Sequence, residues 1–292
     1  MKERQRSRTA EGIAAARAWH LLHEDPVVFA DPFAIQLIPG VLRMFVKSRF
    51  LSRLISGRRV YAYMCPLRAQ SLGRARFAEE KLEEAIKRGT KQYVILGAGL
   101  DSFALRRKDL SSTLKTYELD HPASQRAKRA RLTRLDIVLP KSLEFVPIDF
   151  EKETIVEALS KSTYSNEYPT FFSWLGVTPY LTQEAIFNTL RVVAASSRTG
   201  SEVVFDYNIP KEFVDPVDLP IIDWVARYAA RRGEPLITTF HPHTLEQDVC
   251  DLGFELAEHL SPTEQKKRYF AGRQDRLRPI SWAYFAHFRL RM

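Results

Sequence analysis

Two glycines and an aspartate stand at positions where an α/β protein binds a nucleotide. Gly97 and Gly99 directly follow the short apolar run 92–96, and without a Cβ they let the backbone approach a ligand closely. Asp120 comes 21 residues after Gly99, a spacing at which a carboxylate accepts hydrogen bonds from ribose hydroxyls. A structural turn, with a carboxylate that caps it before Pro122, would use the same residues. Taken alone, the pattern is a weak signal.

A second acidic position sharpens this prediction. Asp149 follows another apolar run, 143–148, and the aromatic residue Phe150 comes next. A carboxylate at this place can accept a hydrogen bond from an adenine amino group, while the ring covers the base. Acidic residues at successive strand ends favour an adenosine-containing cofactor.

The residues after the glycine pair separate two such cofactors. A dinucleotide carries a pyrophosphate, which needs open amides at a helix N-terminus. Asp101 stands at that place, and Ser102 replaces the third glycine of the dinucleotide fingerprint. The carboxylate of Asp101 would repel a phosphate, whereas the sulfonium and ammonium groups of S-adenosylmethionine tolerate it. The sequence therefore favours S-adenosylmethionine and leaves a nicotinamide-dependent oxidoreductase as the alternative.

Short apolar runs alternate with helical patterns, which predicts a mostly parallel sheet with helices on both faces. The last two strands are expected to form an antiparallel pair at one edge. The seven expected strands are 92–96, 115–119, 143–148, 170–175, 202–207, 254–258 and 281–290. The clearest expected helices are 74–87, 123–134, 151–159 and 182–195, the last with Thr182 as its N-cap.

The first 72 residues form a helical segment ahead of this regular pattern. Residues 9–38 read as two helices with a break marked by Asp25-Pro26 and Asp31-Pro32. Residues 41–72 are amphipathic and rich in arginine, which fits either a helix on a membrane surface or a lid over an active site. Because apolar and charged residues alternate irregularly there, we expect a lid and no membrane association. We expect this lid to belong to the same domain as residues 73–292. Its arginines include Arg43, Arg49, Arg53, Arg58 and Arg59.

The composition indicates an ordinary globular protein with a basic surface. Hydrophobic residues make up 45% of the 292 residues, and 44 basic residues against 35 acidic ones give a net charge of +9. The charges are interspersed, so we expect no nucleic-acid partner. The densest basic run is interpreted as the solvated face of a helix, with a phosphate-binding patch as the alternative. It consists of Arg126, Lys128, Arg129, Arg131 and Arg134.

Two cysteines, Cys65 and Cys250, provide neither a disulfide framework nor a zinc site, so we expect a reducing compartment and no metal. The charged N-terminus lacks the apolar core of a signal peptide. Nor does any window reach the roughly 18 apolar residues of a membrane span. These features predict a cytoplasmic protein.

The stretch Gln92-Tyr-Val-Ile-Leu-Gly-Ala-Gly-Leu-Asp-Ser-Phe-Ala-Leu-Arg106 resembles the signature of the leucine carboxyl methyltransferase-like family. More closely, it resembles the bacterial branch of S-adenosylmethionine-dependent O-methyltransferases in that family. The resemblance implies a Rossmann-like class I methyltransferase fold that releases S-adenosylhomocysteine. It continues through most of the chain, at 9–10, 16–18, 31–34, 74–80, 117–122 and 268–270.

The resemblance also implies roles for individual residues. Arg74 would bind the carboxylate of the cofactor, although Arg68 and Arg76 are close enough in sequence to be alternatives. Many relatives carry a glutamate after the fourth strand, where this chain has Leu175. That departure leaves open whether the protein has lost a cofactor contact or a substrate-side carboxylate. The remaining implied contacts are the methionine part of the cofactor with Gly97 and Gly99, the ribose with Asp120, and the adenine with Asp149 and Phe150.

The expected reaction is an in-line attack of an acceptor oxygen on the methyl group of the sulfonium, with a small-molecule carboxylate or hydroxyl as acceptor. A carboxylate needs no base, whereas a hydroxyl needs one near the methyl group. Tyr180, His121, His241 and His243 are base candidates by position only. Besides the oxidoreductase, a cofactor-binding protein without turnover remains an alternative, because Leu175 replaces an acidic residue.

Overall fold

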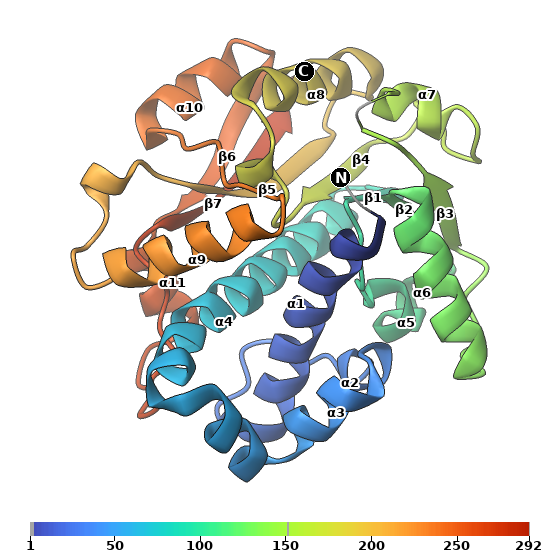
Figure 1. Ribbon diagram of the computed structural model, residues 1–292. Helices are drawn as coiled ribbons and strands as arrows, with labels where there is room; N and C mark the ends of the chain where they lie inside the picture. The colour runs from blue at the N-terminus through green and yellow to red at the C-terminus, as the bar shows by residue number, and fades with distance from the viewer. Residues whose placement is uncertain (1–2, 151, 292) are drawn as a thin grey trace.

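The computed structural model describes the backbone of residues 3–150 and 152–291, and the side chains of these residues except 3–8 and 50–59. A seven-stranded sheet with the order β3-β2-β1-β4-β5-β7-β6 forms its centre (Figure 1). The strands are β1 (Gln92–Leu96), β2 (Lys115–Asp120), β3 (Leu143–Pro147), β4 (Thr170–Trp174), β5 (Glu202–Asn208), β6 (Phe254–Leu260) and β7 (Ala283–Leu290).

The sheet is mostly parallel, as predicted. Strands β1 to β5 pair in parallel, and β7 runs antiparallel to both β5 and β6. Strands β2 and β3 follow one another on one side of β1, and the chain then crosses back so that β4 and β5 lie on the other side of β1. The order therefore reverses between β1 and β4, and α/β sheets bind ligands at the carboxyl ends of the strands at such a reversal.

Helices cover both faces of the sheet (Figure 1). One face packs against α7, α8 and α10, and the other packs against α4 and α5. Because both faces are covered, β1 and β4 are buried along their whole length. The α-helices are α1 (Glu3–His23), α2 (Ala34–Leu37), α3 (Gly40–Lys47), α4 (Arg49–Lys87), α5 (Phe103–Arg106), α6 (Pro122–Arg134), α7 (Ile155–Leu159), α8 (Gln183–Ser196), α9 (Leu219–Arg231), α10 (Pro242–Cys250) and α11 (Pro262–Tyr269). Three short 3₁₀ helices are η1 (Lys108–Leu110), η2 (Thr178–Tyr180) and η3 (Lys211–Phe213).

The N-terminal segment consists of α1 to α3 and the first turns of α4, and it lies to one side of the sheet (Figure 1). An apolar cluster that includes Ala14, Leu37 and Val46 joins α1, α2 and α3. The two helices separated by a break that we expected over residues 9–38 are confirmed as α1 and α2. The expected boundary after residue 72 falls inside α4, a continuous helix of 39 residues.

Most predicted elements agree with the structure within one or two residues at each end. Thr182 caps α8 by accepting a hydrogen bond from the amide of Ala185 at 3.2 Å, as predicted. The helix expected from residue 151 begins only at Ile155, because Thr154 and Glu157 form a capping box there. Position 151 itself lies outside the described residues. Helices α9, α10 and α11 were not predicted.

The basic run of α6 is only partly a solvated face, which corrects the interpretation from sequence. The side chain of Lys128 is 2% exposed, and its Nζ lies 2.5 Å from Oε2 of Glu118 on β2. Arg131 donates to Glu11 of α1 at 2.8 Å and to the carbonyl of Leu37. These two side chains fasten α6 to the sheet and to the N-terminal segment.

Within the part of the chain that is described, no helix is long and apolar enough to cross a membrane. Both cysteines are free thiols, with Cys65 buried and Cys250 half-buried.

Candidate active site

The glycine turn after β1 folds over the end of β2. The amide of Gly97 donates to the carbonyl of Leu119 at 2.8 Å. Gly97 and Gly99 have φ values of 71° and 49°, in the left-handed region that favours glycine. A Cβ at position 97 would lie 2.7 Å from Cγ2 of Val177, and a Cβ at position 99 would lie 3.1 Å from the Cβ of Ala10. Backbone conformation and close packing therefore both require glycine in this turn.

Asp120 ends β2, and its carboxylate faces the glycine turn. Its Oδ2 accepts from the amide of Gly99 at 2.6 Å, and its Oδ1 accepts from the amide of His121 at 2.6 Å. Two backbone donors thus fix the orientation of a half-buried carboxylate at the sheet reversal. A carboxylate held in this way can accept hydrogen bonds from ribose hydroxyls.

Arg74 lies across the sheet reversal from Asp120, in the second half of α4. Its Nη1 donates to Oδ2 of Asp206 on β5 at 2.8 Å, and Oδ1 of Asp206 accepts from the amide of Gly176 at 2.6 Å. A Cβ at position 176, where φ is +70°, would collide with the guanidinium. The guanidinium therefore lies directly on the backbone that follows β4. Its bond to Asp206 uses one of the five N–H donors of an arginine.

The two halves of the site are contiguous. Val177, whose side chain lies against Gly97, is the neighbour of Gly176, on which Arg74 lies. The structure thus brings together the glycine turn, the carboxylate of Asp120 and the guanidinium of Arg74.

The other two arginines considered for the same role have different partners. Arg68 donates to Oε1 of Glu24 at 3.0 and 2.5 Å, and its guanidinium lies 5.8 Å from the ring centroid of Trp19. It is therefore part of the packing between α1 and α4. Arg76 pairs with Glu80 at 2.6 Å on the surface, where its side chain is 51% exposed. Of the three, Arg74 is the one that lies against the backbone after β4.

Asp149 and Phe150 follow β3, next to Asp120. The amide of Ile148 donates to the carbonyl of Asp120 at 3.0 Å, which places the end of β3 beside the end of β2. Oδ2 of Asp149 lies 3.2 Å from the exposed Nζ of Lys152, and Phe150 is half-buried against the core. Both residues are therefore at the edge of the sheet that carries Asp120.

Leu175 occupies the position after β4 where an acidic residue was considered. Its side chain packs on the apolar cluster under α4 that contains Phe77 and Phe103. The carboxylate of Asp206 lies beside this position, because it accepts from the amide of the next residue, Gly176, at 2.6 Å. The acidic group at this end of the sheet thus comes from β5.

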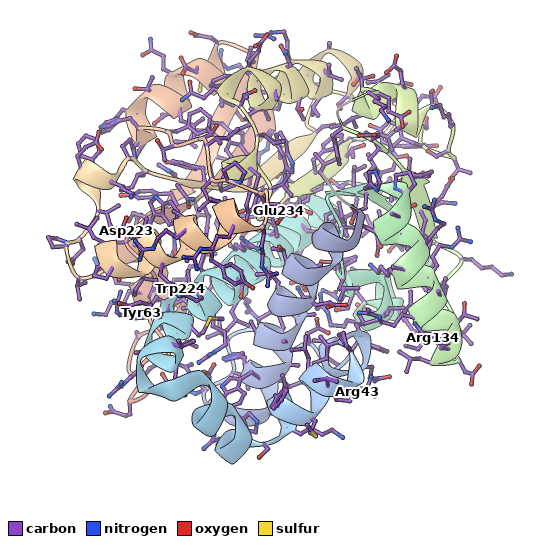
Figure 2. The ribbon with its side chains drawn as sticks, in the orientation of Figure 1. Arg43, Tyr63, Arg134, Asp223, Trp224 and Glu234 are labelled. Atoms are coloured by element: carbon purple, nitrogen blue, oxygen red, sulfur yellow. The ribbon has the colours of Figure 1, made fainter. Side chains whose placement is uncertain are left out.

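Tyr180 is the base candidate that lies nearest to Arg74. Burial raises its pKa above the ordinary value, and the carboxylates of Glu234 and Asp206 act in the same direction while Arg74 opposes them. Its hydroxyl therefore stays protonated at neutral pH and is able to donate a hydrogen bond. Glu234, labelled in Figure 2, accepts from Oγ1 of Thr9 on α1 at 3.0 Å.

The three histidines considered as bases have other positions. His121 is the N-cap of α6, and its Nδ1 accepts from the amide of Ala123 at 3.2 Å. His241 and His243 are exposed at the start of α10, and the ring of His241 contacts Phe213 at a centroid distance of 5.1 Å. Among the described residues, no group of three or more His, Cys, Asp or Glu side chains is arranged to hold a metal ion.

Helix α1 covers the glycine turn. Ala10 lies against Gly99, and Arg17 donates to the carbonyl of Leu100 at 2.7 Å and to Asp31 at 2.8 Å. The side chain of Arg17 is 10% exposed and that of Asp31 is fully buried. The start of α1 therefore lies against one side of the glycine turn.

A groove of about 670 Å³ lies between α4 and α9. Figure 2 shows Tyr63 of α4 and Trp224 of α9 on its walls, with their ring centroids 6.3 Å apart. Each of the two helices connects the groove to the site. Helix α4 carries Tyr63 in the groove and Arg74 eleven residues later, and α9 carries Trp224 in the groove and ends three residues before Glu234. The other residues that line it are Val60, Pro216, Leu219, Pro220, Asp223 and Arg227.

Sequence reasoning did not identify Asp206 or Glu234 as part of this site. Asp206 could have been recognised because it is an acidic residue within the mostly apolar sequence of β5. Every residue of this strand is buried. A buried carboxylate in a strand needs a partner, so this position could have been paired with an arginine in advance. For Glu234, which follows α9, the sequence carries no comparable signal.

Comparison with known proteins gives a consistent result. The family model described as leucine carboxyl methyltransferase matches residues 10–194. A Bacillus subtilis protein, YktD, whose name describes it as an S-adenosyl-L-methionine-dependent methyltransferase, is 31% identical over 98% of this chain and 99% of its own length. A Mycolicibacterium paratuberculosis protein with the same description is 32% identical over 68% of this chain and 66% of its own length.

Solved structures support the same fold. A DUF574 family protein from Streptomyces avermitilis superimposes with a TM-score of 0.61 and 16% identity, over 94% of this chain and 96% of its own. A Thermobifida fusca protein described as a methyltransferase gives a TM-score of 0.60 and 15% identity, over 95% and 94% of the two chains. The Rossmann-like fold expected from the sequence is thereby confirmed.

Proposed function

The chain belongs to the leucine carboxyl methyltransferase family, and from that premise we propose that it methylates an oxygen atom of a small molecule. It is an S-adenosyl-L-methionine-dependent methyltransferase, while the oxygen acceptor, a carboxylate or a hydroxyl, is our proposal. The observation that carries the proposal is the glycine turn with Asp120 on one side and Arg74 on the other.

These residues fit S-adenosylmethionine. The cofactor has a carboxylate for the guanidinium of Arg74 and ribose hydroxyls for the carboxylate of Asp120. We assign the methionine part of the cofactor to the turn at Gly97 and Gly99, whose left-handed φ values require glycine. We assign the adenine to the edge formed by Asp149 and Phe150, which lies beside Asp120.

The same geometry argues against a dinucleotide. The carboxylate of Asp101 accepts from the amide of Phe103 at 2.7 Å, so a negative charge already lies at the start of α5. Helix α5 has only four residues, which gives it a weak dipole. A pyrophosphate at this helix end would meet a carboxylate in place of open amides.

When bound, the cofactor supplies an electrophilic methyl group on a sulfonium, and the protein aligns the acceptor with it and excludes water. Arg74 holds the amino-acid end and is itself oriented by Asp206. Asp120 orients the ribose, and α1 closes over the turn through Ala10. Since Ala10 lies against Gly99, the first turns of α1 must move when the cofactor enters or leaves.

We favour a carboxylate acceptor over a hydroxyl. Tyr180, the base candidate that lies nearest to Arg74, has a raised pKa and so donates a hydrogen bond where a hydroxyl acceptor would need a base. A carboxylate is already ionised at neutral pH and needs no proton removed. Tyr180 can then orient one carboxylate oxygen while the other attacks.

We place the body of the acceptor in the groove between α4 and α9. Tyr63 and Trp224 offer aromatic surface, and both walls lead toward Arg74 and Glu234. An apolar molecule with a terminal carboxylate matches this arrangement of an apolar groove and a charged end.

The test is methyl transfer from S-adenosylmethionine with a tritiated methyl group to a panel of apolar carboxylic acids and phenols. Methyl esters release volatile tritiated methanol in mild base, whereas aryl methyl ethers do not. We expect base-labile label that is absent with Asp120→Asn. A base-stable label would point to a hydroxyl acceptor, and label only on nitrogen, sulfur or carbon would refute O-methylation.

The same assay separates the alternatives. Tight binding of reduced nicotinamide cofactor, read from its fluorescence, without binding of S-adenosylmethionine would contradict our assignment. Binding of S-adenosylmethionine without transfer to any acceptor would favour a cofactor-binding protein without turnover.

A further inference from the structure

The net positive charge of this protein is concentrated in one stretch of sequence, which corrects our interpretation that basic and acidic residues are interspersed throughout the chain. Residues 32–78 contain nine of the 44 basic residues and none of the 35 acidic ones, so the rest of the chain carries 35 of each. The whole net charge of +9 therefore belongs to 47 consecutive residues. They form α2, α3 and most of α4.

Part of this charge is paired with carboxylates, inside the protein for Arg68 and Arg74 and on the surface for Arg76. Arg68 pairs with Glu24, Arg74 with Asp206, and Arg76 with Glu80. These residues belong to the second half of α4. The other cations of this stretch whose side chains the structure describes are Arg43, Lys47 and Arg49.

Helix α3 and the first residue of α4 carry these three cations on a tip that lies away from the sheet (Figure 1). Arg43, labelled in Figure 2, donates to the carbonyl of Gln36 at 2.8 Å, and Arg49 donates to the carbonyl of His23. Lys47 is exposed. Among the side chains that the structure describes, none of these three cations is paired with a carboxylate.

The same helix exposes apolar side chains beside these cations. Val46 is buried and Leu42 packs on the cluster between α1 and α2, which defines the inner face of α3. The outer face presents Val41, Met44 and Lys47 at intervals of three residues, with Val41 67% exposed and Met44 54% exposed. A nucleic acid would need only the charges, whereas an anionic bilayer uses both the charges and the apolar side chains.

We propose that this tip, residues 40–49, docks on a membrane surface that carries anionic lipids. Val41 and Met44 insert between the headgroups, and Arg43, Lys47 and Arg49 contact the lipid phosphates. This proposal differs from our expectation from the sequence, which was that residues 41–72 do not associate with a membrane. Apolar and charged residues alternate irregularly over that range, so the exposed apolar side of α3 could not be recognised from the sequence. Membrane docking would leave the packing of the N-terminal segment intact, because the inner face of α3 contacts α1 and α2 while the outer face is exposed.

The experiment is flotation of the full-length protein with vesicles of phosphatidylcholine containing 30 mol% phosphatidylglycerol (about one lipid in three), against pure phosphatidylcholine. We expect binding only to the anionic vesicles and release as salt is raised. Lys47→Glu changes the charge by two units, and each unit near such a surface contributes about fivefold to binding. The substitution should therefore lower the partition coefficient by roughly 25-fold. Val41→Asp with Met44→Asp should lower it by about tenfold or more.

A matched control is Val217→Asp with Ile237→Asp, because these side chains are 61% and 53% exposed and lie outside the tip. This control should bind vesicles as the unaltered protein does. Absence of binding to anionic vesicles, or equal losses for the tip and control variants, would overturn the proposal. So would binding to a short DNA duplex without binding to the anionic vesicles, since that would identify a nucleic-acid surface.

Discussion

Replacement of Arg74 by methionine tests the most specific assignment in the site. Arg74→Met removes the guanidinium but keeps an unbranched side chain of similar reach on α4. A hydrogen bond between charged groups contributes about 1.5–3 kcal/mol, and each 1.4 kcal/mol is tenfold in affinity. The dissociation constant for S-adenosylmethionine should therefore rise by roughly 10- to 100-fold.

The same substitution also leaves Asp206 without its cation. That carboxylate is 1% exposed and, among the residues that the structure describes, would keep the amide of Gly176 as its hydrogen-bond partner. Removing one member of a buried ion pair costs about 3–5 kcal/mol. A loss of binding in Arg74→Met alone could therefore come from a destabilised protein.

The double variant Arg74→Met with Asp206→Asn separates stability from binding. It removes both buried charges, and the amide oxygen of the new asparagine can still accept from Gly176. We expect the free energy of unfolding to return to within about 1 kcal/mol of the unaltered protein. Affinity for S-adenosylmethionine should stay low, because no guanidinium is restored.

Calorimetric titration and urea denaturation measure the two effects. Methylthioadenosine lacks the amino-acid part of the cofactor, so its affinity should be the same for the unaltered protein and the double variant. Arg76→Met is the matched control, because Arg76 is on the same helix and its surface ion pair contributes little. Full affinity for S-adenosylmethionine in the double variant, or an equal loss for methylthioadenosine, would refute contact between Arg74 and the cofactor carboxylate.

Three further predictions concern the surroundings of the site and the groove. Gly176→Ala should raise the dissociation constant for S-adenosylmethionine about tenfold or more, because the new Cβ displaces Arg74, and unchanged affinity by calorimetry would contradict this. Burial raises the pKa of Glu118 to about 7, so its contribution to stability is complete below pH 4.5 and is lost as the pH rises through 7. Lys128→Met should therefore cost about 3 kcal/mol in urea denaturation at pH 8 and clearly less at pH 5, and equal costs would disprove the argument. Trp224→Ala should raise KM for the acceptor at least several-fold with little change in cofactor affinity, whereas an unchanged KM would remove the groove from the acceptor site.

The strands and the glycine turn could be predicted because their signals are local. Strand β1 is a run of residues buried on both faces, and Gly97 must be glycine because of its positive φ. The position of Asp120 could be predicted from its spacing of 21 residues after Gly99. The roles of these residues in cofactor binding remain predictions, but their meeting at one edge of the sheet is a consequence of parallel strand order.

The choice among three arginines could not be made from sequence, because all three stand on one helix within nine residues. Our proposal of Arg74 is supported by the different partners of the three side chains. Arg68 meets Glu24 from α1, and Arg74 meets Asp206, which is 132 residues away. Contacts of this range depend on how the helices pack on the sheet, and no local pattern encodes that.

Helix α11 could have been found from sequence. Ser261 and Glu264 form a capping box, a four-residue signature of a helix start. Conversely, Lys128 read as a surface residue because its neighbours in the run are charged. Its burial depends on Glu118, a strand residue that faces α6.

The central claim is that this chain binds S-adenosylmethionine between Asp120 and Arg74. Calorimetric titration of the full-length protein with S-adenosylmethionine and S-adenosylhomocysteine, repeated with Asp120→Asn, tests it most directly. We predict micromolar binding, about −8 kcal/mol, for the unaltered protein and at least a tenfold weaker constant for the variant. Absence of binding to the unaltered protein, or the same affinity in the variant, would contradict the account.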